Sequence, residues 1–311
     1  MKYNATRLAT ILALGTIIFS GTNNFLTKIA VTAVKDPILF TTLKNALVAV
    51  FIVGIIIIFK KWAEIKSLSK QQIIKLVAVG VIGGSVPFAL YFTGLAQTSA
   101  LNASLIHKTL FIWVLILAIP ILKERLSNLQ WLGVIAIFAA NLLVGGFTGF
   151  KFNLGELMIL GATVLWAVEN VIAKIILRDL SSLTVVAARM VLGSLILFVL
   201  VLWQGHLSLL SGLNAMQWGW TVLTSVLLLG YVLTWYTALK YAPATYVATL
   251  LVPATLITNI LSAIFITHTL SGQQVMSSLL YAAGMALMII FAKKTAINIP
   301  ATEPISFSPL R

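Results

Sequence analysis

Cysteine is absent from the 311 residues, and charge is scarce, because only 9% of the residues are charged. The absence of cysteine excludes disulfides, thiolate catalysis and cysteine-based metal sites. A soluble domain carries charge on roughly a quarter of its residues, so this composition does not provide a water-exposed surface. With 60% hydrophobic residues and a mean hydropathy of +1.06, the chain must present most of its surface to lipid.

Acidic residues are the scarcer kind of charge, 7 against 21 Lys and Arg, which gives a net charge of +14. Such an excess can indicate nucleic-acid binding, but here the basic residues lie mainly between apolar segments, as the positive-inside rule describes. We therefore expect a lipid bilayer and a small-molecule metabolite as partners, and no nucleic acid. The sequence offers no metal cluster, phosphate-binding glycine loop or catalytic triad, so we expect no catalytic residue, metal or cofactor. A homo-oligomer is left open.

Long apolar runs divide the chain. A bilayer-spanning helix needs about 20 mainly apolar residues, and apolarity on all sides of such a run predicts a membrane helix rather than an amphipathic one. The first run continues past a poor cleavage site, which favours an uncleaved helix over a signal peptide. The sequence thus predicts an all-α integral membrane protein with ten transmembrane helices. The runs fall at about 8–30, 38–59, 73–95, 102–121, 129–148, 154–177, 184–203, 216–239, 246–267 and 274–292.

The basic residues predict the orientation of these helices. With the N-terminus placed inside, 14 of the 21 Lys and Arg fall in inner segments, and only Lys35 and Lys151 fall in outer ones. This asymmetry predicts a multi-pass protein of the cell (plasma) membrane with both termini in the cytoplasm. The last segment, 295–311, is rich in proline and is predicted to be a disordered cytoplasmic tail.

The two halves of the chain repeat each other. Residues 15–29 align with residues 161–175 at a constant shift, so that Asn24 and Lys28 fall on Asn170 and Lys174. One helix later, Lys44 falls on Arg189. Each half then holds five helices, and an odd number forces the halves into opposite membrane orientations. We predict two inverted repeats, 1–150 and 151–294, an architecture of transporters whose substrate site lies near the midplane between the repeats.

Short motifs in both halves carry a family resemblance. The segment Ala100–Leu126 opens after the small-residue turn Thr98-Ser99-Ala100 and ends at Lys123-Glu124-Arg125-Leu126, and the second half keeps Ala242-Pro243-Ala244. These features resemble EamA-type members of the drug/metabolite transporter superfamily, whose signature is glycine-glutamate-arginine-leucine. The second half departs at His268-Thr269-Leu270. The resemblance implies two five-helix repeats, a transporter rather than an enzyme, and cargo such as amino acids, sugar nucleotides or sugar phosphates.

Polar residues inside the runs are candidates for the transport pathway, because intramembrane charges usually face a bundle interior or a water-filled cavity. Asn24 and Lys28 lie four residues apart and share a helix face, as do Trp166, Asn170 and Lys174. We predict that these two stripes line one pathway. The alternative is that Lys28 and Lys174 only extend to the headgroups.

Four further basic residues lie about two turns into their helices. Lys44 and Arg189 would bind an anionic group or, alternatively, cap backbone carbonyls; Arg would offer a two-point carboxylate contact and Lys a single charge. His107 and Lys108 are predicted to face cargo. Tyr91, Trp166 and Trp235 are predicted to supply aromatic walls.

Glu169 is the only acid deep inside an apolar run. We predict that it couples transport to protons or binds a substrate amine; the alternative is a structural ion pair with a lysine. The sequence therefore favours a secondary transporter that works by alternating access and exports an amino acid or related carboxylate. One alternative is a carrier of sugar phosphates or nucleotide sugars. The other is a membrane-embedded lipid-handling enzyme, which would need a catalytic partner for Glu169.

Overall fold

The computed structural model describes residues 5–34, 36–143, 149 and 152–292, apart from the side chains of residues 28, 31–33 and 100–101. Within these ranges the regular structure is helical and contains no strand. The elements are α1 (Ala5–Val34), α2 (Pro37–Ile58), α3 (Trp62–Lys66), α4 (Lys70–Ala78), the π-helix η1 (Val79–Gly83), α5 (Val86–Leu95), α6 (Ala100–Lys108), α7 (Leu110–Leu122), α8 (Asn128–Leu142), α9 (Leu154–Ile176), α10 (Ser182–Trp203), α11 (Ser208–Ser211), α12 (Ala215–Tyr241), α13 (Ala244–Leu251), α14 (Ala254–Ser262), the π-helix η2 (Ala263–Thr267) and α15 (Gly272–Ile290).

Nine helical stretches of the described chain are long and apolar enough to cross a membrane. Three of these stretches combine several elements: α4 to α5, α6 to α7, and α13 to η2. The predicted run at 129–148 corresponds to α8, which is shorter, and residues 144–148 lie outside the described part. The predicted tail over 295–311 also lies outside it.

Polar residues at the ends of the apolar runs determine where helices begin. Ser69 and Gln72 form a capping box at α4, in which each side chain binds the backbone of the other residue. Ser127, Asn214 and Ser271 begin α8, α12 and α15 in the same way. These boxes satisfy amide groups that have no partner inside the helix, and each of these helices starts one to three residues before its apolar run.

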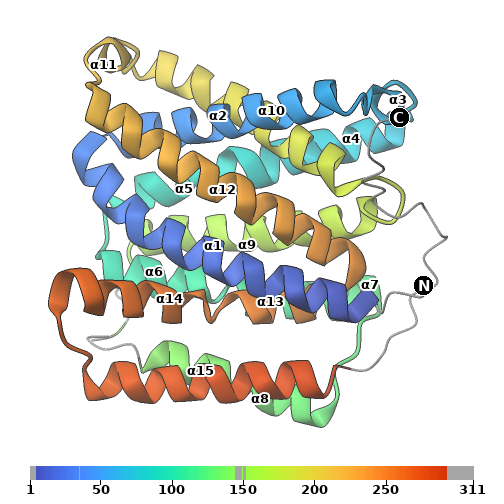
Figure 1. The fold of residues 1–311 in the computed structure, drawn as a ribbon, viewed down its shortest axis with the longest axis vertical. Coiled ribbons are helices and arrows are strands. Elements are labelled where there is room, and N and C mark those ends of the chain that lie inside the picture. Colours follow the sequence, from blue (N-terminus) through green and yellow to red (C-terminus); the bar gives the residue numbers. More distant parts are fainter. Residues whose placement is uncertain (1–4, 35, 144–148, 150–151, 293–311) are drawn as a thin grey trace, which may run out of the picture.

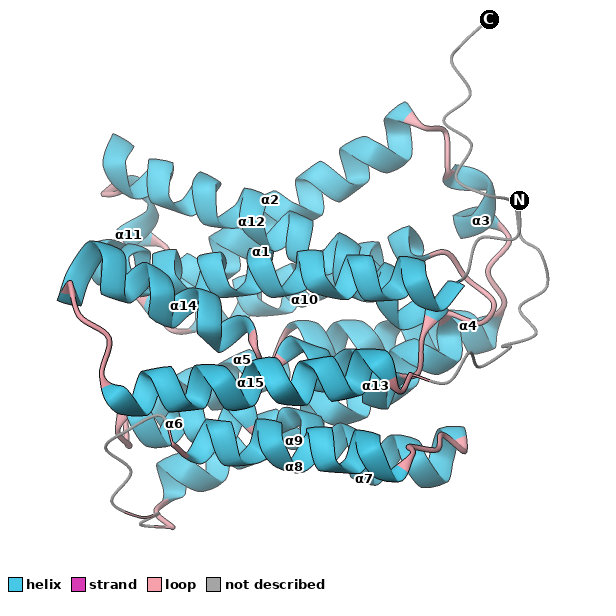
Figure 2. Ribbon diagram, turned by 60° about the horizontal axis from the view of Figure 1, so that its bottom comes forward, coloured by secondary structure: helices cyan, strands magenta, loops and turns pink. Residues whose placement is uncertain are grey.

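The helices pack in pairs drawn from distant parts of the chain. α1 lies along α12, α2 along α10, α5 along α9, and α8 along α15 (Figures 1 and 2). Small residues allow some backbones to approach closely: a Cβ on Gly133 of α8 would lie 2.9 Å from the Gly284 carbonyl of α15. Membrane helices pack in this way because lipid provides no hydrophobic drive for association.

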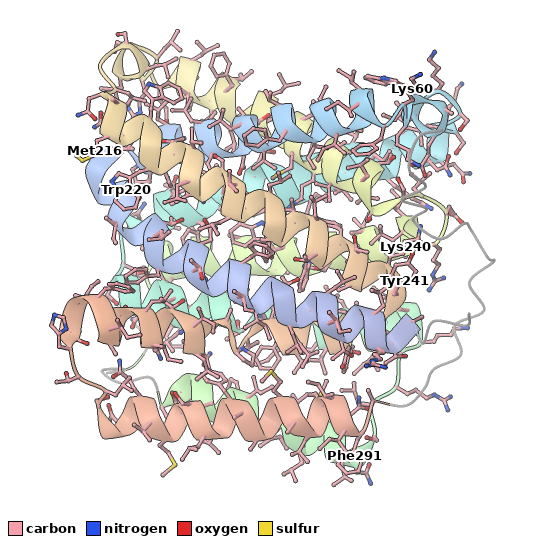
Figure 3. All side chains as sticks on the ribbon, viewed as in Figure 1. Lys60, Met216, Trp220, Lys240, Tyr241 and Phe291 are labelled. Carbon is pink, nitrogen blue, oxygen red and sulfur yellow. The ribbon has the colours of Figure 1, made fainter. Side chains whose placement is uncertain are left out.

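The two ends of the helix bundle differ in chemistry. Figure 3 places Lys60, Lys240, Tyr241 and Phe291 at one end, and Met216 at the other. α1 begins and α15 ends at the same end as Lys60 and Lys240 (Figure 1). We call this the basic end of the bundle.

All three of the combined membrane stretches are interrupted near their middles. The first is broken between Gly83, which ends η1, and Val86, which begins α5. α6 gives way to α7 at Thr109, whose hydroxyl donates to the Ile106 carbonyl at 2.6 Å. α13 gives way to α14 at Val252 and Pro253, and proline lacks the N–H that a continuous helix needs. Helix termini are thereby created in the interior of the bundle rather than at its ends.

Candidate functional site

The candidate site is built around a backbone carbonyl, that of Gly83 at the end of η1. In a continuous helix this carbonyl would accept from the residue four positions later, which is Pro87 and has no N–H. Two side chains from other helices take its place. Trp166 of α9 donates its Nε1–H at 3.1 Å, and Arg189 of α10 donates its Nη2–H at 3.2 Å. The Gly83 carbonyl, which lacks its helical donor, thus joins η1, α9 and α10 at one point.

Glu169 of α9 lies beside the same glycine and is only 2% exposed. The Tyr236 hydroxyl of α12 donates to its Oε1 at 2.5 Å. A Cβ on Gly83 would lie 2.4 Å from Glu169 Cγ and 3.2 Å from Arg189 Nε. The two oppositely charged side chains therefore flank a position that only glycine can occupy.

Arg189 is buried without a direct ion pair in the described part of the chain, although the charge of Glu169 lies near it. In the described part of the chain, no ion pair within 4.0 Å reaches its guanidinium, and its buried Nε has no hydrogen-bond partner. The guanidinium carbon lies 5.8 Å from the centroid of the Tyr236 ring, within cation–π range. The predicted alternative of a Glu169–lysine ion pair is not found among the described residues, where Glu169 hydrogen-bonds Tyr236 instead.

Aromatic rings line one side of this group. Trp166 contacts Phe88 edge-on, with centroids 5.1 Å apart, and His107 edge-on at 4.9 Å. Tyr91 lies 5.5 Å from His107 and 5.9 Å from Trp166. The Nδ1 of His107 is buried and lacks a hydrogen-bond partner among the described residues. The sequence predictions for Tyr91, His107 and Trp166 thus concern residues that the fold brings together.

Of two further predicted residues, Asn170 lies one turn after Trp166 in α9, and Trp235 directly precedes Tyr236 in α12. Asn170 donates its Nδ2–H to the Trp166 carbonyl at 2.8 Å, and its buried Oδ1 has no partner in the described chain. Trp235 of α12 is buried and stacks on Tyr231, with centroids 6.1 Å apart. Unpaired acceptors and aromatic faces beside buried charges are features of a polar ligand site.

Lys44 and Lys108 lie outside the group formed by Glu169 and Arg189. Lys44 is 8% exposed, and its Nζ lies 5.3 Å from the centroid of the Phe40 ring. Lys108 ends α6 at the helix interruption and is partly buried. Neither ammonium group makes a hydrogen bond or ion pair with another described residue. Their predicted contact with cargo stays a prediction.

In the second predicted polar stripe, Lys174 is occupied by backbone carbonyls. Lys174 Nζ donates to the carbonyls of Leu239, Lys240 and Ala242 at 2.6, 3.2 and 2.7 Å. It therefore caps the end of α12, as cations commonly do at helix C-termini. Asn24 is exposed, and the side chain of Lys28 lies outside the described part.

The sequence analysis missed two components of the site. One is the carbonyl of Gly83, and the other is Tyr236 as the hydrogen-bond donor to Glu169. A proline four residues after a glycine within an apolar run predicts a free carbonyl, so Gly83 had a local signal. Tyr236 had no such local signal, because it lies 67 positions from Glu169 in the sequence and their contact depends on how α12 packs against α9.

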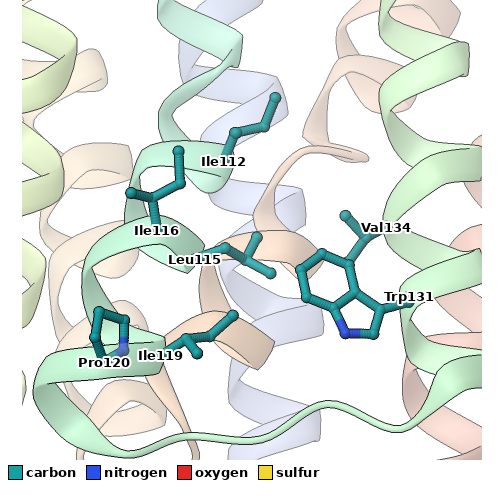
Figure 4. A pocket seen from close by; sticks show the side chains of 7 residues that line it. All are labelled: Ile112, Leu115, Ile116, Ile119, Pro120, Trp131 and Val134. Carbon is teal, nitrogen blue, oxygen red and sulfur yellow. The ribbon is translucent and has the colours of Figure 1, made fainter.

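A separate groove of about 260 Å³ lies between α7 and α8 (Figure 4). Its walls include Ile112, Ile116 and Pro120 of α7 and Trp131 and Val134 of α8. Ile116 and Trp131 are strongly exposed, as expected for side chains that face lipid. The groove has no charged group, so it does not suit a polar cargo.

Comparison with known proteins identifies the family. The EamA-like transporter family matches this chain twice, over residues 7–146 and 153–290. The chain belongs to the EamA-like transporter family. The family is one of membrane transporters rather than of enzymes, which agrees with what the sequence motifs predicted.

Curated relatives of the transporter carry the same general description. It is 31% identical over 171 residues to the uncharacterized transporter YyaM of Bacillus subtilis, covering 53% of this chain and 56% of that protein. It is 24% identical over 144 residues to an uncharacterized transporter of Methanothermobacter thermautotrophicus, covering 44% of this chain and 42% of that protein. The chain thus spans about half the length of these relatives. A crystal structure matches the fold with a TM-score of 0.75 and 17% identity, over 92% of this chain and 98% of that chain.

Proposed function

We propose that the transporter is a secondary carrier that exports an amino acid or related carboxylate by alternating access. The observation that carries the proposal is the buried group of Arg189 and Glu169, two opposite charges without an ion pair between them. An amino acid presents a carboxylate and an ammonium group a short distance apart. Arg189 would bind the carboxylate through parallel N–H groups, and Glu169 would accept from the ammonium group or exchange a proton.

The same pair of charges favours an amino acid over the alternative cargoes. A sugar phosphate or nucleotide sugar carries a phosphate or diphosphate group with more than one negative charge. An ionised Glu169 beside Arg189 would repel such a group. The aromatic rings of Trp166, Tyr91 and Trp235 suit an apolar or aromatic side chain. We therefore place carboxylate-bearing zwitterions before phosphorylated sugars.

We infer that the architecture is ten helices in two inverted repeats, residues 1–150 and 151–294. The contact between α1 and α12 has its counterpart in the contact between α5 and α9, while α2–α10 and α8–α15 each join repeat-related helices. A two-fold relation between the halves would produce this pairing. The two matches to the family, one in each half, also support it.

The helix interruptions support alternating access. In the repeat alignment, the break at Thr109 corresponds to the break at Pro253, and both lie inside the membrane stretches. Discontinuous helices at the midplane are where inverted-repeat transporters bind their cargo. Rocking of one half against the other would open the site to each side in turn.

We propose the cell membrane as the location, with the basic end of the bundle and both termini in the cytoplasm. Lys60 and Lys240 lie at this end, and cytoplasmic segments are the ones enriched in Lys and Arg. Export is proposed from the family resemblance.

The test is transport by purified protein in liposomes against a labelled panel of amino acids, sugar phosphates and nucleotide sugars. We expect uptake of at least one amino acid and none of the phosphorylated sugars. Arg189→Gln should lose transport, and Arg189→Lys should retain a small part of it, because lysine offers one charge without the planar fork.

Arg178→Gln is the matched control, because Arg178 is an exposed arginine at the turn after α9. It should transport like the parent protein. Transport of a phosphorylated sugar without any amino acid, or an unaffected Arg189→Gln variant, would contradict the proposal.

A further inference from the structure

A dense cluster of lysines joins the end of α2 to the start of α4. Lys60, Lys61, Lys66, Lys70 and Lys75 fall within sixteen residues, and the first four are exposed. The short helix α3 lies in the middle of this segment, and Lys60 projects from the edge of the bundle beside it (Figure 3). We call residues 60–75 the basic segment.

The basic segment lies where lipid-facing side chains end. Ile58 and Phe59, directly before it, are 74% and 58% exposed, and Ile74 within it is 67% exposed. Large apolar side chains exposed at the ends of membrane helices face acyl chains. Trp62 is 40% exposed beside them, and tryptophan is enriched at the boundary between acyl chains and headgroups. The lysines of the segment therefore lie at the level of the phospholipid headgroups.

The acid within the segment does not neutralise these lysines. Glu64 accepts from the Ser181 amide at 2.7 Å, from the Ser181 hydroxyl at 2.5 Å and from the Thr184 hydroxyl at 2.5 Å. Its carboxylate is thus committed to the N-terminus of α10. Asp179, exposed in the preceding turn, forms no ion pair with a described lysine.

We propose that the basic segment binds the headgroups of anionic phospholipids. Compact ammonium groups attract a phosphate diester as point charges, and clusters of four to eight Lys or Arg next to a membrane helix bind anionic lipid in this way. Because Glu64 connects α3 with α10, lipid bound here also holds the N-terminus of α10 in place. This inference is independent of the proposed cargo.

Each lysine near an anionic surface contributes about fivefold to binding. Neutralising three of them should therefore weaken binding about a hundredfold. The interaction should also weaken as salt is added, because the lysines are exposed and mobile ions screen them.

The experiment uses the full-length protein in detergent, titrated with short-chain phosphatidylglycerol, phosphatidylcholine or inorganic phosphate. The readout is hydrogen–deuterium exchange of residues 59–75 and of the first turns of α10. We expect protection with phosphatidylglycerol only, with an affinity about a hundredfold lower for the triple variant Lys61→Gln, Lys66→Gln, Lys70→Gln. The matched control Lys123→Gln, Arg125→Gln, Arg178→Gln removes three exposed cations elsewhere at the basic end and should keep the parent affinity.

Equal protection by phosphatidylcholine would overturn the proposal, as would an equal loss in the control variant. Protection by inorganic phosphate at the same concentration would show a phosphate site rather than a lipid site. Titration of the parent protein at rising salt gives a second reading that needs no variant, and protection that does not change with salt would also contradict the inference.

Discussion

At the scale of single residues, Arg189 keeps most of its donors available. A guanidinium offers five N–H groups, and the described hydrogen bond of Arg189 uses one of them on the Gly83 carbonyl. Burial of a charge without a direct ion pair is costly, and the nearby charge of Glu169 offsets part of that cost, so the remaining N–H groups are suited to a ligand. This reasoning separates Arg189 from Lys174, whose ammonium group is fully used by three carbonyls.

The first prediction concerns Glu169. Glu169→Gln keeps an oxygen that accepts from Tyr236 but cannot exchange a proton, so we expect the loss of transport driven by a pH gradient with normal insertion and folding. The measurement is accumulation of the identified cargo in liposomes with and without the gradient. Asp179→Asn, which neutralises an exposed acid, is the control. A full response to the gradient in the Glu169 variant would exclude it as the coupling group.

The second prediction concerns Lys108. It ends α6 at the helix interruption, and no described residue pairs with its ammonium group. Lys108→Met keeps most of the length and removes the charge, so cargo affinity should fall about thirtyfold, which corresponds to about 2 kcal/mol for a charge-assisted hydrogen bond. The affinity is read from thermal-shift titration of the purified variant. Unchanged affinity with unchanged stability would place Lys108 away from the cargo.

The sequence located part of the candidate site. Glu169 and Asn170 lie three and four residues after Trp166 in one helix, α9. Their spacing in the sequence is therefore enough to place them near each other. The pairing of Glu169 with Tyr236, and of Arg189 with Gly83, joins helices far apart in the chain. Such contacts depend on packing between elements, which residue spacing does not encode.

At the scale of elements, carboxylates from the first half of the chain cap helices of the second half. Glu124 accepts from the Ala244 amide at 2.7 Å, from the Thr245 amide at 2.9 Å and from the Thr245 hydroxyl at 2.7 Å. Glu64 does the same at α10. The signature glutamate therefore caps the N-terminus of α13 from another segment of the chain.

The third prediction follows from this cap. Glu124→Gln weakens the interaction with the positive end of α13 and should cost about 1 kcal/mol of stability. We expect a lower unfolding temperature in detergent for this variant. Arg125→Gln, which changes an exposed neighbouring residue, should unfold like the parent protein. Equal unfolding temperatures for the two variants would show that the cap adds no stability.

The elements themselves were largely predictable, since the apolarity of each membrane stretch is a local property of the sequence. Nine of the ten predicted runs correspond to stretches that meet the length and hydropathy of a membrane span. The interruption at Thr109 and the π-helix η1 with the break that follows it were not predicted. Averaged over a whole membrane span, the hydropathy stays high in both stretches even though His107, Lys108 and Thr109 are polar, so the average carries no signal of a break.

At the scale of the whole molecule, the fourth prediction concerns topology. Reporter fusions at Lys66 and Arg311 should read as cytoplasmic and a fusion at Lys151 as external, because the basic residues gather at one end of the bundle. A fusion within the exposed turn at Gly205, on the side opposite Lys240, should also read as external. An external reading at Arg311 would remove the ten-helix arrangement.

The carbonyl of Gly83 has a consequence for the transport cycle. A buried guanidinium needs acceptors for its N–H groups whether or not cargo is bound. Here Arg189 donates to the Gly83 carbonyl, which is free to accept because Pro87 has no N–H. If Arg189 binds the cargo carboxylate as proposed, that carboxylate would compete with the Gly83 carbonyl for the same N–H groups, so the contact between α10 and η1 would differ between the vacant and the loaded carrier.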